Sequence, residues 1–126
     1  MKKIKLAVNG TLMRALALNR NLVDVGAVFV NETATAPVYR LWSIKGAYPA
    51  MLRDEHTGSS IEVEIWELTA EALVEILENE PPGLCIGWVE LNNGERVMGV
   101  LGEPYIIEGH EEITGWGGWR NYLDHK

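Results

Sequence analysis

Alternating apolar and polar positions give the clearest structural signal in the chain. Ile61, Val63 and Ile65 alternate with glutamates, and a period of two places the three apolar side chains on one face of a β-strand. Other short apolar runs lie between turn residues and predict further strands. These runs are Ile4–Val8, Gly26–Val30, Val38–Ile44, Tyr48–Arg53, Leu84–Leu91 and Arg96–Leu101. The pattern favours a small domain in which strands dominate.

One segment has a helical period instead. Leu73 and Ile76 fall on the same face of a helix. Thr69 stands at the N-cap position, and the Pro-Pro-Gly sequence at 81–83 prevents the helix from continuing. We therefore expect a helix from Thr69 to Glu78.

A hairpin and a second helix are predicted as well. Asn93-Gly94 lies between the runs 84–91 and 96–101 and suits a type I′ turn, because both residues tolerate a positive φ. The segment from Leu12 to Leu22 is rich in alanine and leucine and predicts a short helix, which Thr11 is placed to cap.

Composition and charge limit the classes of function. The chain has 126 residues, 47% of them hydrophobic, which suits one globular domain spanning residues 1–126. Its formal net charge of -7 repels phosphate backbones and anionic lipids, so we expect neither nucleic acid nor a membrane as partner. Cys85 is the only cysteine, and the apolar run at Ile4–Val8 is too short for a signal peptide. We therefore expect a cytoplasmic location.

The loop Asn9–Met13 is the first candidate site, because it follows a strand and precedes a predicted helix. Consecutive backbone amides at such a junction can hold an anionic group, and the helix dipole favours negative charge there. Gly10 would let a ligand approach the backbone closely. The same residues could equally form an ordinary strand-to-helix turn. The substrate-binding candidates are Asn9, Gly10, Thr11, Leu12 and Met13.

Glu80 is the candidate catalytic residue. It follows the predicted helix and directly precedes the Pro-Pro-Gly turn, so its carboxyl group could lie away from water, have a raised pKa and move a proton. The alternative is a surface carboxylate. Glu71, Glu75 and Glu78 are spaced along the helix and are expected to form a solvated face.

Other polar clusters give weaker candidates. Glu62 and Glu64 share one face of their strand, which faces water in an open sheet and lines a pocket only in a closed barrel; we favour the solvated face. The acidic segment 108–112 is too irregular in spacing for a metal site, and no cofactor fingerprint is present. We therefore expect neither a metal nor a cofactor. The cations that could approach a pocket, or equally form surface ion pairs, are Arg40, Arg53 and Arg120.

The order of these segments resembles a known superfamily. A strand, then Asn9–Leu12, then Ile61–Leu68 and the turn at 81–87 resemble the γ-glutamylcyclotransferase-like superfamily, and within it the C-terminal domain of allophanate hydrolase. The likeness covers most of the chain. Further matching segments are 35–41, 102–104 and 113–120. The resemblance implies an α+β fold, a small mixed β-barrel with peripheral helices, with the Gly-Thr-Leu loop as the floor of a pocket.

The resemblance also implies roles for the candidate residues. In cyclotransferases the loop amides grip the γ-glutamyl group, and a glutamate shuttles the proton that lets the α-amine attack the γ-carbonyl; Glu80 corresponds to that glutamate. The pattern departs at Asn9, where cyclotransferases usually carry an aromatic residue. It also departs at Thr11, near the place where the allophanate hydrolase domain carries a histidine. The substrate is therefore expected to be a small anionic metabolite that bears a carboxylate, either γ-glutamyl or urea-derived.

A non-catalytic role is the alternative. The chain contains no Ser-Ser-Lys amidase machinery, so it could act as an accessory or assembly module for an amidase-type enzyme, or as a homodimer. The aromatic residues near the C-terminus could form the interface, or they could close the bottom of the barrel, which we favour. These residues are Tyr105, Trp116, Trp119 and Tyr122.

Overall fold

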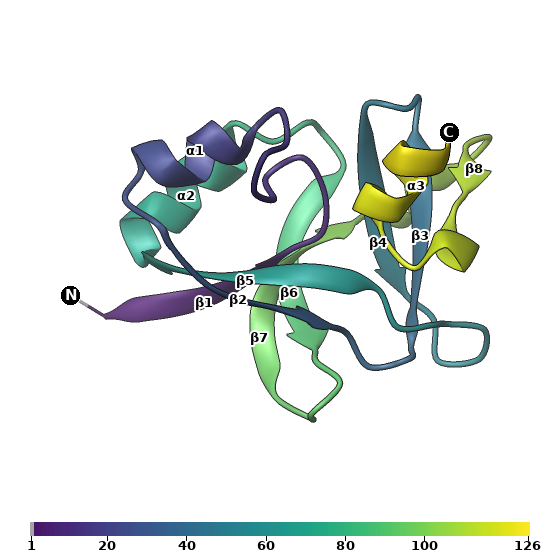
Figure 1. The fold of residues 1–126 in the computed structure, drawn as a ribbon, viewed down its shortest axis with the longest axis horizontal. Helices are drawn as coiled ribbons and strands as arrows, with labels where there is room; N and C mark the ends of the chain where they lie inside the picture. The colour runs from purple at the N-terminus through teal and green to yellow at the C-terminus, as the bar shows by residue number, and fades with distance from the viewer. Residues whose placement is uncertain (1) are drawn as a thin grey trace.

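The fold is built on a five-stranded sheet with the order β2-β5-β1-β7-β6 (Figure 1). The computed structural model describes residues 2–126. Neighbouring strands in this sheet are antiparallel except for β1 and β7, which are parallel. The strands are β1 (Lys3–Val8), β2 (Val28–Ala34), β5 (Glu62–Thr69), β6 (Leu84–Glu90) and β7 (Arg96–Gly102).

A second sheet has three strands in the order β4-β3-β8. They are β3 (Tyr39–Ile44), β4 (Tyr48–Arg53) and β8 (Glu111–Glu112), and β4 contacts β7 of the larger sheet. Within residues 2–126 no strand of one sheet pairs with a strand of the other. The α+β class is therefore confirmed, whereas the closed barrel is not, since the strands form two separate sheets.

The helices lie at the two ends of the molecule (Figure 1). α1 (Asn19–Asp24) and α2 (Ala70–Glu78) lie together beside the five-stranded sheet, and α3 (Trp119–His125) lies beside the smaller one. Two short 3-10 helices, Pro104–Ile107 and Thr114–Trp116, precede α3. In the described part of the chain, each helix falls short of the length and apolar character needed to cross a bilayer.

The predicted helix after Thr69 is confirmed. The Thr69 side chain accepts a hydrogen bond from the Ala72 amide at 3.1 Å, which satisfies one of the free donors of the first turn. Ala72 and Ile76 are buried, whereas Glu71 and the later glutamates of α2 face solvent. α2 ends at Glu78, so the chain has left the helix before it reaches Glu80.

The β6–β7 hairpin is confirmed, but its turn is not of type I′. Gly94 has a φ of +89°, while Asn93 is not among the residues with positive φ in residues 2–126. The Gly94 amide donates to the Leu91 carbonyl, and the Leu91 amide donates to the Glu95 carbonyl. These bonds define a three-residue loop in which only glycine adopts the left-handed region.

The helix predicted over 12–22 is largely absent. Residues 11–18 form turns, and α1 begins only at Asn19. The Leu18 amide donates to the Thr11 carbonyl at 2.9 Å, and Ala15 has a φ of +66°, which no α-helix accommodates. Thr11 therefore caps no helix.

Glu64 corrects the expected solvated face of β5. Its side chain is buried, with 1% exposed, and it accepts hydrogen bonds from the Arg14 amide, the Arg14 and Arg120 guanidinium groups and the Trp66 indole. Both faces of β5 are therefore covered at Glu64. Glu62 is exposed, as expected.

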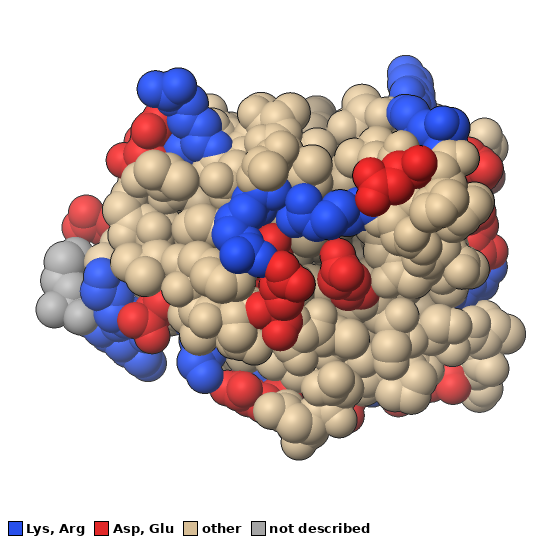
Figure 2. Space-filling model, in the orientation of Figure 1, with Lys and Arg blue, Asp and Glu red and all other residues tan. Residues whose placement is uncertain are grey.

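The C-terminal aromatic residues separate into two pairs. Trp119 and Tyr122 belong to the main core, with 1% and 7% exposed, whereas Tyr105 and Trp116 are exposed. Figure 2 shows that acidic and basic side chains are interleaved on one face of the molecule, with no extended patch of one sign there. The aromatic residues therefore do not form one continuous surface for a partner.

Candidate functional site

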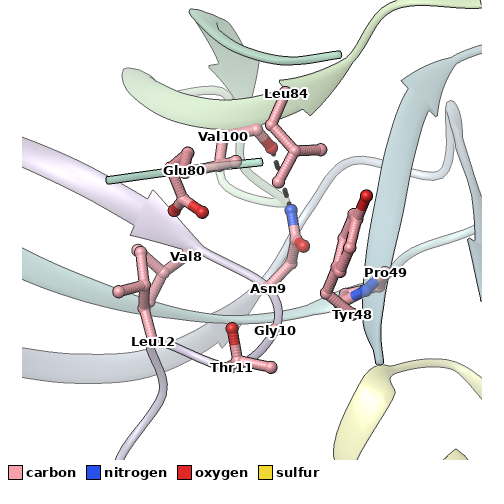
Figure 3. A pocket seen from close by; sticks show the side chains of 10 residues that line it. All are labelled: Val8, Asn9, Gly10, Thr11, Leu12, Tyr48, Pro49, Glu80, Leu84 and Val100. Carbon is pink, nitrogen blue, oxygen red and sulfur yellow. Dashed lines mark hydrogen bonds between the residues drawn. The ribbon is translucent and has the colours of Figure 1, made fainter. Parts of the chain in front are cut away.

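A small pocket with a cavity volume of about 20 Å³ lies where the loop after β1 faces β4, β6, β7 and the segment after α2 (Figure 3). The topology produces it. Because β1 is parallel to β7, with Ala7 opposite Gly99, the chain leaves the sheet beside Val100 and turns toward β4. This space holds about one water molecule, so a larger ligand can bind only if the side chains that line the pocket move apart. The residues that line it are Val8, Asn9, Gly10, Thr11, Leu12, Tyr48, Pro49, Glu80, Leu84 and Val100.

The loop offers free backbone donors to this pocket. The Met13 amide donates to the Gly10 carbonyl at 3.0 Å. In residues 2–126, by contrast, no backbone or side-chain acceptor is hydrogen-bonded to the amides of Gly10, Thr11 and Leu12. Buried amides normally have a partner, so three consecutive free donors beside a pocket mark a place where a ligand oxygen or water completes the structure.

Glu80 lies across the pocket from this loop. Its amide donates to the Leu77 carbonyl at 3.1 Å, and Pro81 ends any continuation of the helix. Figure 3 shows its carboxyl group pointing toward the segment from Val8 to Leu12. Burial raises the pKa of Glu80 to about 7, because the ionised form loses hydration without gaining a compensating cation.

Asn9 enters the pocket in a fixed orientation. Only 4% of the residue is exposed. Its Nδ2 donates to the Val100 carbonyl at 2.9 Å and to Met51 Sδ at 3.8 Å. The first of these bonds links the end of β1 to β7 and so holds the pocket wall together.

Packing against β4 requires a glycine at position 10. A Cβ placed on Gly10 would lie 2.4 Å from Cδ and 2.6 Å from Cγ of Pro49. The pyrrolidine ring of β4 therefore occupies the space that any side chain at position 10 would need. This contact sets how closely the loop approaches β4 and gives a structural reason for glycine beside its expected role toward a ligand.

Met13 is a correction to the predicted site. Its side chain is fully buried in the main core and is not part of the pocket lining. The loop turns at Gly10–Met13, so that the first four residues face the pocket and the fifth faces the interior. The residues that sequence reasoning missed are Val8, Tyr48, Pro49, Leu84 and Val100. Their apolar or common side chains carry no local signal of a pocket.

No arginine, lysine or histidine in residues 2–126 lines the pocket. The three arginines considered from the sequence all form ion pairs elsewhere: Arg40 with Asp54 and Glu112, Arg53 with Glu55 and Glu90, and Arg120 with Glu64. An anion in the pocket would therefore be held by neutral donors. The described residues also contain no group of histidine, cysteine and carboxylate side chains arranged to hold a metal.

Comparison with known proteins agrees with this fold. A urea amidolyase from Lachancea kluyveri is 34% identical over 96% of the chain, which spans only 7% of the length of that enzyme. The crystal structure of a protein specific to uropathogenic E. coli superposes with a TM-score of 0.97 at 46% identity, covering 100% of this chain and 99% of that one.

The crystal structure of the Kluyveromyces lactis urea amidolyase contains the same fold, with a TM-score of 0.93 and 29% identity over 99% of this chain and 8% of that one. A gamma-glutamyl cyclotransferase superposes with a TM-score of 0.56 at 12% identity over 88% of this chain and 70% of that one, which shows a shared fold. The allophanate hydrolase C-terminal domain matches residues 4–124. The chain therefore belongs to the allophanate hydrolase C-terminal domain family, within the γ-glutamylcyclotransferase-like fold.

Proposed function

We propose that this protein binds a small carboxylate-bearing metabolite in the pocket and that Glu80 moves a proton to or from it. The observation that carries the proposal is the pairing of three free amides, at Gly10, Thr11 and Leu12, with the half-buried carboxyl group of Glu80 in one pocket. The amides would hold the carboxylate of the ligand, in the way that backbone donors hold anions elsewhere.

The pKa of Glu80 suits it to both directions of proton transfer. At about 7, the acid and its conjugate base are both populated near neutral pH, which is where general acid–base catalysis is most effective. No second titratable side chain lines the pocket in the described part of the chain except Tyr48. Glu80 is therefore the residue to which the proton transfer is assigned.

Two substrate classes fit this arrangement, and family membership favours the second. With a γ-glutamyl compound, Glu80 would take a proton from the α-amine as its nitrogen attacks the γ-carbonyl, and would return it to the leaving amine. With an N-carboxylated urea derivative, Glu80 would protonate the nitrogen as its bond to the carboxyl carbon breaks and CO₂ leaves.

The test is Glu80→Gln, which keeps the shape of the side chain and removes its ionisable proton. Turnover of γ-glutamyl amines and of carboxyurea-type substrates should fall at least about 100-fold, the lower range for loss of a general acid–base residue. Glu78→Gln, at the exposed last residue of α2, should leave turnover unchanged. Turnover in Glu80→Gln equal to the wild type, or no turnover by the wild type of either class, would contradict the catalytic part of the proposal.

A role beside an amidase-type partner is the second candidate. The match to this chain covers only 7% of the length of each urea amidolyase. In those enzymes a domain of this family is therefore one part of a much longer protein. We infer that this chain could pair with a separate amidase-type enzyme. Size-exclusion chromatography and a pull-down with such an enzyme test this directly. A monomer that captures no partner would remove the support for this candidate.

A further inference from the structure

The side-chain amide of Asn9 is held so that only one of its two ends is available. Both Nδ2 hydrogens have acceptors, the Val100 carbonyl at 2.9 Å and Met51 Sδ at 3.8 Å. Rotating the amide by half a turn would place Oδ1 against the Val100 carbonyl, where two acceptors would face each other. The hydrogen-bond network therefore fixes the orientation: the nitrogen faces β7, and the oxygen faces the other way.

The Asn9 oxygen is an acceptor without a donor. No donor in residues 2–126 bonds to Oδ1. The described residues also contain no fully enclosed side-chain nitrogen or oxygen that lacks a partner. Oδ1 must therefore border open space, and the open space that Asn9 lines is the pocket. Figure 3 shows the side chain between Val100 and Tyr48, with its nitrogen toward Val100 and its oxygen turned away from it.

This acceptor lies next to the free donors of the same loop. Gly10, whose amide is unpaired, is the residue that follows Asn9. A ligand whose carboxylate rests on the Gly10–Leu12 amides can therefore reach Oδ1 only with atoms close to that carboxylate. The site then combines backbone amides that donate to an anion with one acceptor, Asn9 Oδ1, for an uncharged N–H group.

We propose that Asn9 Oδ1 accepts a hydrogen bond from an N–H group of the ligand, so that the pocket selects acids with an N–H group on the carboxyl carbon or one carbon away from it over acids with CH₂ or CH₃ there. This selectivity rests on the proposed carboxylate binding by the loop amides. It favours amino, amido or ureido acids over simple keto and alkanoic acids.

The expected size of the selectivity follows from one hydrogen bond. An apolar group against Oδ1 leaves a buried acceptor unpaired, whereas an N–H group satisfies it. One neutral hydrogen bond corresponds to about a five- to tenfold difference in Kd. Glu80 is a second acceptor when it is ionised, so the source of the preference has to be assigned with a variant.

Two pairs of acids of matched size and charge test the proposal. N-acetylglycine and levulinate differ by NH against CH₂, and oxamate and pyruvate differ by NH₂ against CH₃. Titrations of the ¹⁵N-labelled protein give each Kd and locate binding through the amide signals of Gly10, Thr11 and Leu12. The nitrogen-bearing acid of each pair should bind about five- to tenfold more tightly. Equal affinities, within twofold, in the pairs that bind would overturn the role of Asn9 and leave carboxylate binding intact.

The variant Asn9→Leu assigns the preference to Asn9. Leucine has a similar volume and no acceptor, so the preference should fall below twofold while levulinate and pyruvate still bind. Asn31→Leu, the same exchange at an exposed position of β2, should keep the full preference. A preference that survives in Asn9→Leu would assign it to Glu80 and overturn the proposal. If Asn9→Leu does not fold, the acids are compared in Glu80→Leu, where a preference that is retained supports Asn9 and a preference that is lost overturns the proposal. The failure of all four acids to shift the three amides would instead contradict the proposed function itself.

Discussion

Replacing Glu80 by glutamine should make the protein more stable at alkaline pH and leave its stability at pH 4 nearly unchanged. In the folded state the pKa of Glu80 is raised by burial from its ordinary value of 4.5 to about 7. The folded protein therefore binds this proton more tightly than the unfolded chain does. Between those two values the free energy of unfolding must fall as the pH rises, because unfolding releases the proton.

The magnitude follows from the same two values. Each pH unit between 4.5 and about 7 corresponds to about 1.4 kcal/mol, so the ionised carboxylate costs up to about 3 kcal/mol of stability above pH 7. Glutamine resembles the neutral acid in shape and cannot ionise. Glu80→Gln should therefore match the wild type at pH 4 and exceed it by up to about 3 kcal/mol at pH 8.5, which is about 10 °C in Tm for a domain of this size.

Urea denaturation at pH 4, 5.5, 7 and 8.5 measures this difference. Glu78→Gln is the matched control, because Glu78 is the exposed last residue of α2. The stability of this variant should stay within about 0.5 kcal/mol of the wild type at every pH. A Glu80→Gln variant that differs from the wild type by the same amount at every pH would refute the argument, since it would mean that Glu80 is not a buried acid.

Three further substitutions test the parts of the fold that position the site. Glu64→Gln should lower the free energy of unfolding by about 3 kcal/mol, because Arg14 and Arg120 lose the buried carboxylate that both contact; a loss below 1 kcal/mol in urea denaturation would contradict this. Gly10→Ala should cost about 1–3 kcal/mol through its clash with Pro49 and weaken oxamate binding in the same titration, whereas unchanged stability would show that the loop can move away from β4. Thr69→Ala should cost about 1 kcal/mol through loss of the N-cap of α2, and an unchanged Tm would show that the cap contributes nothing.

Local sequence patterns correctly predicted those strands and helices whose conformation is determined by their own side chains. The alternation through Ile65 predicted strand β5, and Thr69 together with the following apolar face predicted α2. The turn type at Asn93 and the helix after Thr11 were predicted wrongly. The bond from Leu91 to Glu95 makes the turn a three-residue loop, and the bond from Leu18 to Thr11 closes a loop in place of a helix.

From the sequence, only the part of the pocket lining that has a local sequence signal could be predicted. Four of the five loop residues line the pocket together with Glu80, because a glycine loop after a strand and a carboxylate after a helix are both visible in the sequence. The opposite wall, with Tyr48 and Pro49 from β4, depends on how the two sheets meet. The burial of Glu64 was likewise invisible, since the arginines that neutralise it lie 50 and 56 residues away.

The measurement that most directly tests ligand binding at this site is a crystal structure of the protein with oxamate. The account predicts electron density in the pocket with a carboxylate oxygen at about 3 Å from at least two of the Gly10, Thr11 and Leu12 amides, and with Glu80 within about 3.2 Å of the ligand directly or through one water. Oxamate bound elsewhere, with those three amides paired to protein atoms or covered by apolar side chains, would contradict it.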